Sequence, residues 1–182
     1  IYNSSIILQI ILNHMNKGYA ILLTLLFLFT TSFAVSQTVA YEKVTADILA
    51  GATSVSVVSE ADFSAGDRVL LIQMQGADYD NTDGTLDGID NAGLFEELIV
   101  SGTSAGQVDF TSPTVNAYDE TGNVQLVRAF SQAGNYTLNT NVNVAPWAPA
   151  TGEGGVYFMH IGGTLTMNAN INADGAGFGG GD

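Results

Sequence analysis

The feature that most constrains the fold of this 182-residue chain is a repeat of eight residues near its C-terminal end. Residues 137–144 read TLNTNVNV, and residues 166–173, which lie 29 positions later, read TMNANINA. In both copies small or apolar residues alternate with asparagine, so an extended strand places the two kinds on opposite faces. Stacking the copies would bury a thin apolar core and align the asparagines in ladders, as in β-solenoid coils.

We therefore predict that residues 131–182 begin a glycine-rich parallel β-solenoid, with a pair of ordinary sandwich strands as the alternative. Residues 175–182 read GAGFGGGD, and we expect the native protein to continue beyond this glycine-rich stretch. An open last coil would present an unpaired strand edge, which native proteins normally cover. The alternation predicts the following inward and outward residues: Met167, Ala169 and Ile171 inward, and Asn168, Asn170 and Asn172 outward.

The part of the chain before the repeat is also rich in short β-type runs, and helical periodicity is nearly absent from it. We predict a small β-sandwich or barrel over residues 37–130, so the fold class of the whole chain is all-β. The apolar run Val69–Ile72 predicts a central strand buried on both faces, and Gly102–Gly106 predicts a hairpin loop. The expected strands are Lys43–Leu49, Ser54–Val58, Arg68–Met74, Glu96–Ser101, Gln107–Phe110 and Val124–Phe130.

The N-terminal region has the pattern of a secretory signal peptide. Met15 precedes a single lysine, Lys17, and the apolar run 20–29 (AILLTLLFLF), and the small residues 34–36 (AVS) suit cleavage before Gln37. We assign residues 15–36 to the signal peptide and residues 1–14 to upstream sequence outside the native protein. The alternative is a transmembrane anchor, but spanning a bilayer takes about 20 apolar residues. We therefore expect a secreted or cell-surface product without a stable membrane span.

The composition excludes several function classes. The chain has 18 acidic residues against 4 basic ones and a formal net charge of −14, so it lacks the cations that neutralise nucleic-acid phosphates or anionic lipids. It contains no cysteine, which excludes disulfides, thiolate zinc sites and cysteine nucleophiles. The expected partners are extracellular polysaccharides or proteins.

A run of carboxylates between residues 78 and 90 is the strongest candidate for a metal site. It contains no cation, and calcium prefers carboxylate, amide and carbonyl oxygens. The spacing does not match an EF-hand, because an aspartate stands where the loop needs glycine and no glutamate closes it. Calcium is the expected ion if one binds, because magnesium seldom uses all-protein cages, and a solvated acidic loop is the alternative. The five candidate ligands are Asp78, Asp80, Asp83, Asp87 and Asp90.

No catalytic constellation is visible, and we expect no enzyme activity from this segment. His160 is the only histidine after the signal peptide and lies in an apolar run, without a second histidine for zinc or a paired nucleophile. Glycosidase-type carboxylate pairs would have to come from Glu96, Glu97, Asp119 and Glu120. Adjacent acids in a strand point to opposite faces, which argues against such pairs.

The aromatic residues offer a second kind of binding site. Aromatic rings combine apolar area with polar tips, which suits stacking against sugars, although core filling is their commoner use. The candidates for a sugar-stacking platform are Trp147, Tyr136, Tyr79, Tyr118 and Tyr157.

Several segments together resemble the N-terminal region of very large secreted bacterial surface proteins of the adhesin-like kind. They are residues 66–76 (GDRVLLIQMQG), 124–128 (VQLVR), 145–147 (APW) with Gly154–Gly155, and 175–180 (GAGFGG). Residues 148–153 (APATGE) depart from the small polar loop usual after the tryptophan. The resemblance covers nearly all of the chain after residue 36 and implies architecture and location, often with export by type IX secretion, rather than an activity.

Three functions follow as hypotheses. The first is a noncatalytic structural or adhesion module at the N-terminus of a large exported cell-surface protein. The second is a carbohydrate-binding or carbohydrate-active β-helix protein whose active coils lie beyond Asp182. The third is a calcium-dependent stabiliser or linker domain.

Overall fold

A computed structural model describes residues 38–80 and 82–177. The expected signal peptide, the segment before it and the last residues of the glycine-rich stretch lie outside these ranges. The described residues are all-β, as predicted: they form strands, turns and a single 3-10 turn, η1 (Glu120–Gly122), and contain no α-helix. A search of the same residues found no helix long and apolar enough to cross a membrane.

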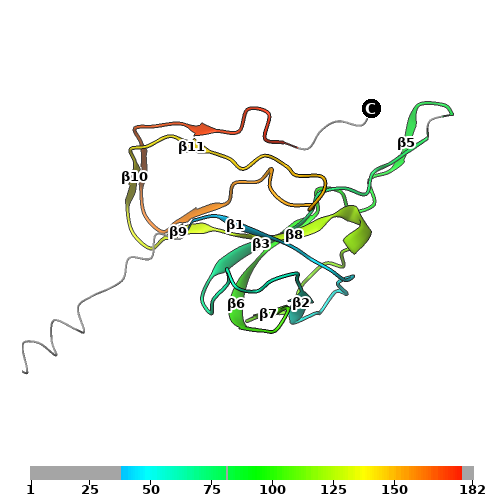
Figure 1. The fold of residues 1–182 in the computed structure, drawn as a ribbon, viewed down its shortest axis with the longest axis horizontal. Coiled ribbons are helices and arrows are strands. Elements are labelled where there is room, and N and C mark those ends of the chain that lie inside the picture. Colours follow the sequence, from blue (N-terminus) through cyan, green and yellow to red (C-terminus); the bar gives the residue numbers. More distant parts are fainter. Residues whose placement is uncertain (1–37, 81, 178–182) are drawn as a thin grey trace, which may run out of the picture. The chain divides into compact units, whose positions relative to one another are not determined.

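The first structural region is a curled antiparallel sheet of six strands, which we call the half-barrel (Figure 1). Its two edge strands approach each other, because Val44 and Val57 form an isolated antiparallel bridge just beyond their ends. The order across the sheet is β1 (Ala40–Lys43), β8 (Val124–Arg128), β3 (Arg68–Gln73), β6 (Phe95–Ser104), β7 (Gln107–Phe110) and β2 (Ser54–Ser56).

The concave side of the half-barrel holds a closed apolar core. Alternation along β3 points Val69 and Leu71 into this core, whereas Leu70 and Ile72 on the other face are only half-buried. The prediction that Val69–Ile72 is central is confirmed, but the prediction that both its faces are buried is wrong, because an antiparallel sheet commonly covers one face only. The core also contains Val44, Val55, Val100, Val108, Val124 and Leu126.

The strand that is buried on both faces is β8. Val124 and Leu126 face the half-barrel core, and Gln125 and Val127 on the opposite face are also fully buried. The cover on that opposite face comes from residues 148–157, which follow much later in the chain and hydrogen-bond to Gln125. Burial of β8 therefore depends on a segment that local periodicity does not reveal.

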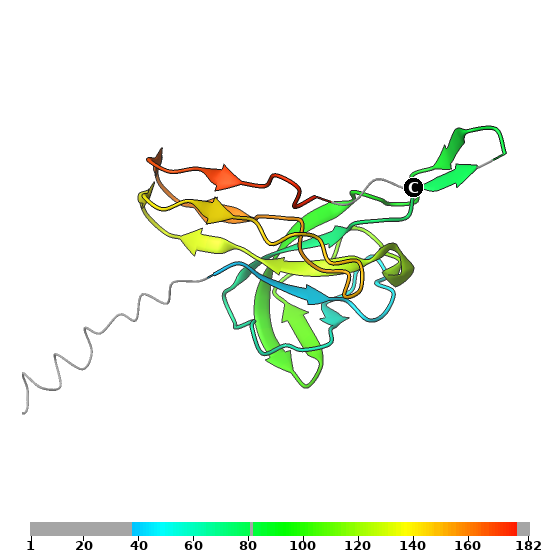
Figure 2. The same cartoon turned by 45° about the horizontal axis from the view of Figure 1, so that its top comes forward.

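One hairpin lies within the sheet and a second one lies outside it. The predicted hairpin loop shortens to the turn at residues 105–106, because β6 continues through Ser104 and Gly106 supplies the left-handed φ of +71° that the turn requires. The second hairpin pairs β4 (Asp78–Asp80) with β5 (Thr85–Gly88) and extends away from the sheet (Figures 1 and 2).

The second structural region consists of two stacked layers of short strands. Each strand of the first layer pairs in parallel with the strand 29 residues later, for example Leu138 with Met167. We call residues 130–147 layer 1 and residues 159–176 layer 2. The pairs are β9 (Phe130–Gln132) with β12 (Met159–Ile161), β10 (Tyr136–Leu138) with β13 (Leu165–Met167), and β11 (Val142–Asn143) with β14 (Ile171–Asn172).

Candidate functional site

Asparagine side chains tie the two layers together at the predicted offset. Asn139 Oδ1 accepts a hydrogen bond from Asn168 Nδ2 at 2.9 Å, and Asn141 Oδ1 accepts one from the backbone N–H of Asn170 at 2.9 Å. Asn135 Oδ1 accepts from the backbone N–H of Thr164 at 2.8 Å, again across 29 residues. One of these bonds joins two asparagine side chains as expected of a ladder, whereas the other two join an asparagine side chain to a backbone N–H. All three hold the same register, and a one-residue slip would exchange the two faces.

The outer face of β11 and β14 is hollowed into a shallow polar groove of about 400 Å³. Its lining is dominated by amide groups, which both donate and accept hydrogen bonds. Asn172 Oδ1 accepts from the backbone N–H of Asp174, so that end of the groove is internally ordered. The polar lining residues are Asn141, Asn143, Asn170, Asn172 and Asp174.

The apolar faces of the two layers differ in burial. Leu138 in layer 1 is 3% exposed, whereas Met167, its register partner in layer 2, is 48% exposed. Leu165 in the same strand of layer 2 is 38% exposed. Of the three residues predicted to face inward, Ala169 and Ile171 are half-buried and Met167 is exposed. Layer 1 therefore has cover that layer 2 lacks.

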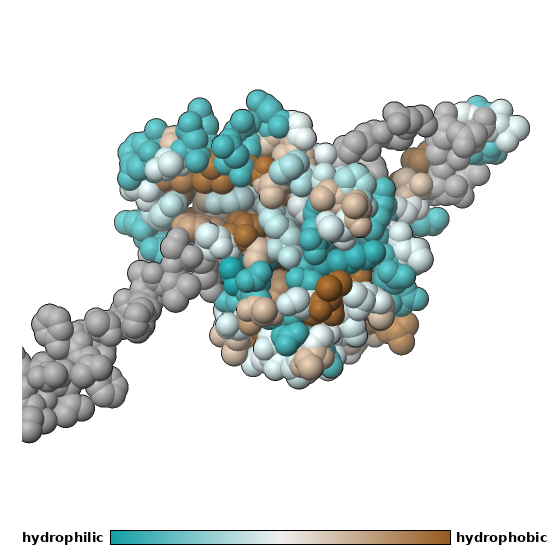
Figure 3. All heavy atoms as spheres, viewed as in Figure 1, coloured by the Kyte–Doolittle hydropathy of each residue, from teal (hydrophilic) through white to brown (hydrophobic). Residues whose placement is uncertain are grey.

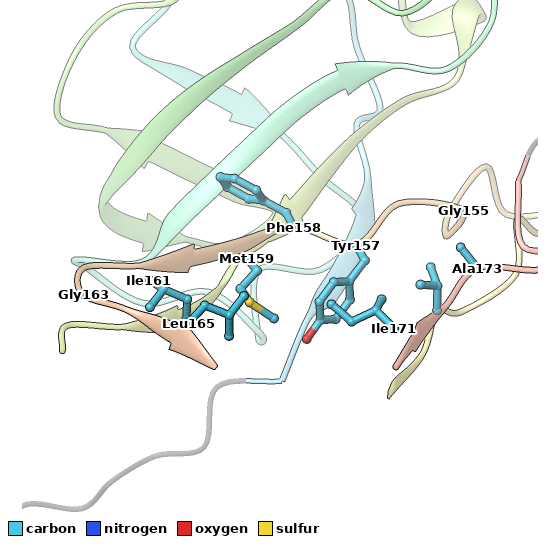
Figure 4. Close-up of a pocket in the computed structure, with 10 residues that line it drawn as sticks. Gly155, Tyr157, Phe158, Met159, Ile161, Gly163, Leu165, Ile171 and Ala173 are labelled. Atoms are coloured by element: carbon cyan, nitrogen blue, oxygen red, sulfur yellow. The ribbon is translucent and has the colours of Figure 1, made fainter. Parts of the chain in front are cut away.

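An open apolar groove of about 740 Å³ lies against the layers. In the close-up, Met159, Ile161 and Leu165 lie together at one end and Tyr157, Ile171 and Ala173 at the other (Figure 4). Burial, and to a lesser degree the neighbouring Tyr136, raise the pKa of the Tyr157 phenol above its ordinary value. No charged residue lines the groove. The space-filling view shows apolar surface in a hollow beside a hydrophilic rim (Figure 3).

The segment between the layers, residues 148–157, attaches layer 1 to the half-barrel. The Gln125 side chain donates from Nε2 to the Gly154 carbonyl at 2.9 Å and accepts at Oε1 from the Gly154 N–H at 3.0 Å. Tyr41 Oη donates to the Val156 carbonyl at 2.6 Å. Gly154 has a φ of +92°, and a Cβ there would overlap the Pro146 carbonyl. The sequence analysis did not identify Gln125 as a functional residue. Its signal was a single amide between the apolar residues Val124 and Leu126 of β8.

The five predicted calcium ligands are spread along the β4–β5 hairpin and the turn after it. Asp80 Oδ1 accepts from the Thr82 N–H, and Asp83 Oδ1 accepts from the Thr85 N–H and Oγ1. These hydrogen bonds lower the pKa values of both carboxyl groups. Asp78 and Asp87 lie on β4 and β5, and Asp90 has a positive φ of 30°. Among the side chains that the structure describes, which do not include those of Asp78 and Asp87, no group of three or more acidic or histidine side chains is arranged to hold a metal ion.

The acids considered for catalysis include Glu96 and Glu97, whose carboxylates bond to other groups of the half-barrel. Glu96 accepts hydrogen bonds from the Val115 N–H and the Tyr118 hydroxyl. Burial and this bond raise the Tyr118 pKa. Glu97, on the opposite face as predicted, pairs with Arg68.

The other pair, Asp119 and Glu120, lies at η1. Asp119 Oδ1 caps this turn by accepting from the Thr121 N–H at 2.9 Å, and Glu120 is in its first turn. His160 lies in β12 opposite Ser131 of β9. The carboxylates of Glu96 and Asp119 therefore both accept hydrogen bonds that order nearby chain.

The aromatic candidates do not form one platform. Tyr118 belongs to the half-barrel core and Trp147 is buried at the end of layer 1. The Tyr136 ring contacts Phe130, with 4.8 Å between ring centroids. Tyr157 is the one candidate that lines the open groove among the described side chains. Tyr79 lies on β4.

Comparisons with known proteins give weak structural similarity only. A scan against protein-family models found no match, and a search of curated proteins found none. Among solved structures, the tailspike protein gp49 of Pseudomonas phage LKA1 matches with a TM-score of 0.42 and 13% identity over 73% of this chain and 22% of that one.

Two other phage tailspikes match at a similar level. Gp54 of the Acinetobacter baumannii phage AP22, solved in complex with A. baumannii capsular saccharide, gives a TM-score of 0.39 and 13% identity over 74% of this chain and 24% of that one. Gp61, the tailspike of Pseudomonas phage phi297, gives a TM-score of 0.39 and 12% identity over 74% of this chain and 31% of that one. The chain thus spans less than a third of the length of each of these structures.

Proposed function

We propose that this chain is a noncatalytic structural or adhesion module at the N-terminus of a large exported cell-surface protein. In this proposal the half-barrel is a base on which a parallel β-solenoid starts, and layers 1 and 2 are its first two coils. The observation that carries the proposal is the repeated 29-residue offset of the strand pairs and of the asparagine hydrogen bonds between them.

The hydrogen bonds between the half-barrel and the segment that follows layer 1 support the half-barrel as the structural base of the solenoid. The buried Gln125 amide makes two hydrogen bonds to Gly154, and Tyr41 makes a third bond to Val156. A solenoid needs terminal units that protect its ends, because each coil buries its apolar face only against its neighbours. A half-barrel with its own closed core meets that need at one end.

Support for a noncatalytic role comes from the use of the polar side chains. Glu96 and Asp119 are engaged by backbone N–H groups of nearby loops, and Glu97 is paired with Arg68. These hydrogen bonds and this ion pair give the three acids structural partners within the chain.

Two experiments test the proposal. Expression of the full chain in a bacterium, followed by mass spectrometry of the exported fraction, should give a product that starts at Gln37; mature material that retains residues 20–29 would contradict export by a cleaved signal. Hydrogen exchange on that product should show protected Asn170 N–H, and Asn141→Ala should expose it because Asn141 Oδ1 is its acceptor. An Asn170 amide that is unprotected in the unmodified chain would contradict the stacked coils.

The polar groove favours a second candidate function, which is carbohydrate binding. Its amides could bond to sugar hydroxyls, since both groups donate and accept. A titration with purified bacterial capsular polysaccharides, followed by amide NMR shifts, tests this. Loss of the shifts in Asn143→Ala but not in the remote Asn116→Ala would support it, and the absence of shifts with every polysaccharide would reject it.

A further inference from the structure

We propose that the exposed face of layer 2 is the docking site of a third coil of the same repeat, supplied by the polypeptide that follows layer 2. The inference rests on the proposed function and deepens it, because it names the partner of this face and the register in which that partner binds. It starts from an interface that the structure already contains, the contact between layers 1 and 2.

The first argument is burial at equivalent positions. Leu138 is covered and Met167, at the same register position one layer later, is 48% exposed. Leu165 and Ile171 line the open groove next to it. Apolar surface left exposed to water costs free energy, which burial against another coil would recover. A further coil stacked on layer 2 would cover these side chains.

The second argument is the backbone edge. Within the described residues, β12, β13 and β14 each belong to a two-stranded ladder and pair only with the strand of layer 1. Their other edge therefore offers unpaired N–H and C=O groups, in line with the apolar groove. Such an edge is a template for another parallel strand.

The third argument is the asparagine pattern, which sets the register of the occupant. Asn139 and Asn141 present side-chain oxygens that accept from layer 2. Asn168 and Asn170 occupy the same positions one layer later, so they present the same acceptors outward from layer 2. The occupant should then carry apolar residues opposite Leu165 and Ile171 and hydrogen-bond donors opposite these two asparagines.

The fourth argument concerns the path of the chain and favours an occupant in cis. The Trp147 N–H donates to the Ala176 carbonyl at 2.9 Å, and these two residues are again 29 positions apart. Layer 2 is therefore still paired with layer 1 at Ala176, which corresponds to Trp147. In layer 1, the chain enters the connecting segment directly after Trp147. A chain that repeats this path arrives above layer 2.

An extended protein tests the proposal. A copy of residues 154–177 is appended after Asp182, which places each copied residue 29 positions after its original, and both methionines of the copy are changed to leucine. The readout is the rate of Met167 oxidation by hydrogen peroxide, measured by peptide mass spectrometry, because thioether oxidation follows exposure. The matched control carries aspartate at the copies of Leu165 and Ile171.

We expect the extension to slow Met167 oxidation several-fold relative to the unextended chain, and the aspartate control to leave it unchanged. Equal rates in all three proteins would overturn the docking site. Protection that appears in the unextended chain and grows with its concentration would assign the face to a second copy and also overturn the proposal. Hydrogen exchange of the Asn170 amide in the same samples distinguishes failure of the docking site from failure of the proposed function. If the Asn170 amide is unprotected in all three proteins, the proposed function itself fails.

Discussion

The half-barrel and the pair of layers solve the same burial problem in different ways. In the half-barrel, antiparallel strands curl around a closed core in which Val69, Leu71 and Leu126 have no exposed surface. In the layers, short parallel strands stack on one another, and burial differs between register partners: Leu138 in layer 1 is buried, whereas Met167 in layer 2 is exposed. The half-barrel strands therefore enclose their own core, although the outer face of β8 is covered by residues 148–157, whereas layer 2 keeps apolar side chains exposed.

The two regions also use buried or aligned amides differently. In the half-barrel, Gln73 donates to the Gln75 and Asp90 carbonyls, and its Oε1 accepts from the Asp119 N–H. This amide joins loops that are far apart in sequence. In the layers, Asn139 and Asn141 bond to residues 29 positions away and repeat a single register. The Gln73 amide ties loops of the half-barrel together, whereas the asparagine amides link one layer to the next.

The largest expected effect is in the half-barrel core. Leu71→Ala should lower the free energy of unfolding by about 2–5 kcal/mol, because the residue is fully buried and its cavity cannot collapse easily. Chemical denaturation measures the change. The matched variant in the layers, Leu165→Ala, should cost under about 1 kcal/mol at its partly exposed position. Equal costs would remove the distinction between the two regions.

A comparison within the layers comes next. Leu138→Ala should cost about 2–3 kcal/mol of local stability, near the low end for buried leucines. Met167→Ala should cost under about 0.5 kcal/mol because its side chain is already exposed. Amide exchange at Asn168 and Asn170 reports both changes. If Met167→Ala proves as costly as Leu138→Ala, layer 2 has cover that the structure lacks.

The attachment between the two regions should be weaker than either core. Gln125→Ala should cost about 1–3 kcal/mol, because the N–H and carbonyl of Gly154 lose their partners in a buried setting. Exchange in residues 148–157 and layer 1 should rise while exchange in β3 stays slow. Gln132→Ala, at an exposed position of layer 1, is the control. A rise in β3 exchange as large as that in layer 1 would show that the regions unfold as one unit.

Acid should loosen the capped turn and the hairpin before either core. Hydrogen bonds from Thr121 and Thr85 lower the pKa values of Asp119 and Asp83, so their contribution is present above the unfolded pKa and is lost as the pH falls through the folded pKa. Thermal stability should therefore decline below about pH 5. The Glu42 pKa is raised by partial burial, which opposes this trend.

Asp119→Asn should flatten that decline, and thermal melts from pH 6 to 3 measure it, where carboxyl groups titrate. Glu120→Gln is the charge-matched control at the neighbouring position. If the melting temperature of Asp119→Asn falls with pH as steeply as that of the unmodified chain, groups other than Asp119 cause the acid sensitivity.

The smallest expected effect is that of calcium on the β4–β5 hairpin. Asp80 and Asp83 already accept hydrogen bonds from their own turns, so we expect the melting temperature to respond equally to calcium and to sodium at matched ionic strength. A rise with the logarithm of calcium beyond the sodium control would instead assign an ion to this segment. Asp83→Asn then identifies the ligand.

The features that could be predicted from sequence are those that depend on local alternation. Residues 137–144 and 166–173 predicted their own pairing and asparagine ladder, because period-two patterning and a constant offset are visible in the letters. The adjacent acids Glu96 and Glu97 were likewise expected on opposite faces. Each of these inferences needed only neighbours in the same strand.

The features that escaped prediction depend on segments that meet from far apart. The double burial of β8 requires residues 148–157 to fold back onto Gln125. Alternation in residues 166–173 predicted that Met167 faces inward, but its 48% exposure could not be predicted because the pattern does not show which residues cover the strand. The acidic run was considered as a calcium loop because composition records charge but not the turns that engage Asp80 and Asp83.

Residue-resolved hydrogen exchange on the intact chain tests most directly the claim that the half-barrel strands enclose their own core while layer 2 keeps apolar side chains exposed. Backbone amides open with free energies that follow local burial and hydrogen bonding. The account predicts the slowest exchange in β3 and β8, intermediate exchange in β10 and β11 of layer 1, and the fastest in β13 and β14 of layer 2. Uniform protection of all six strands, or slower exchange in layer 2 than in layer 1, would contradict it.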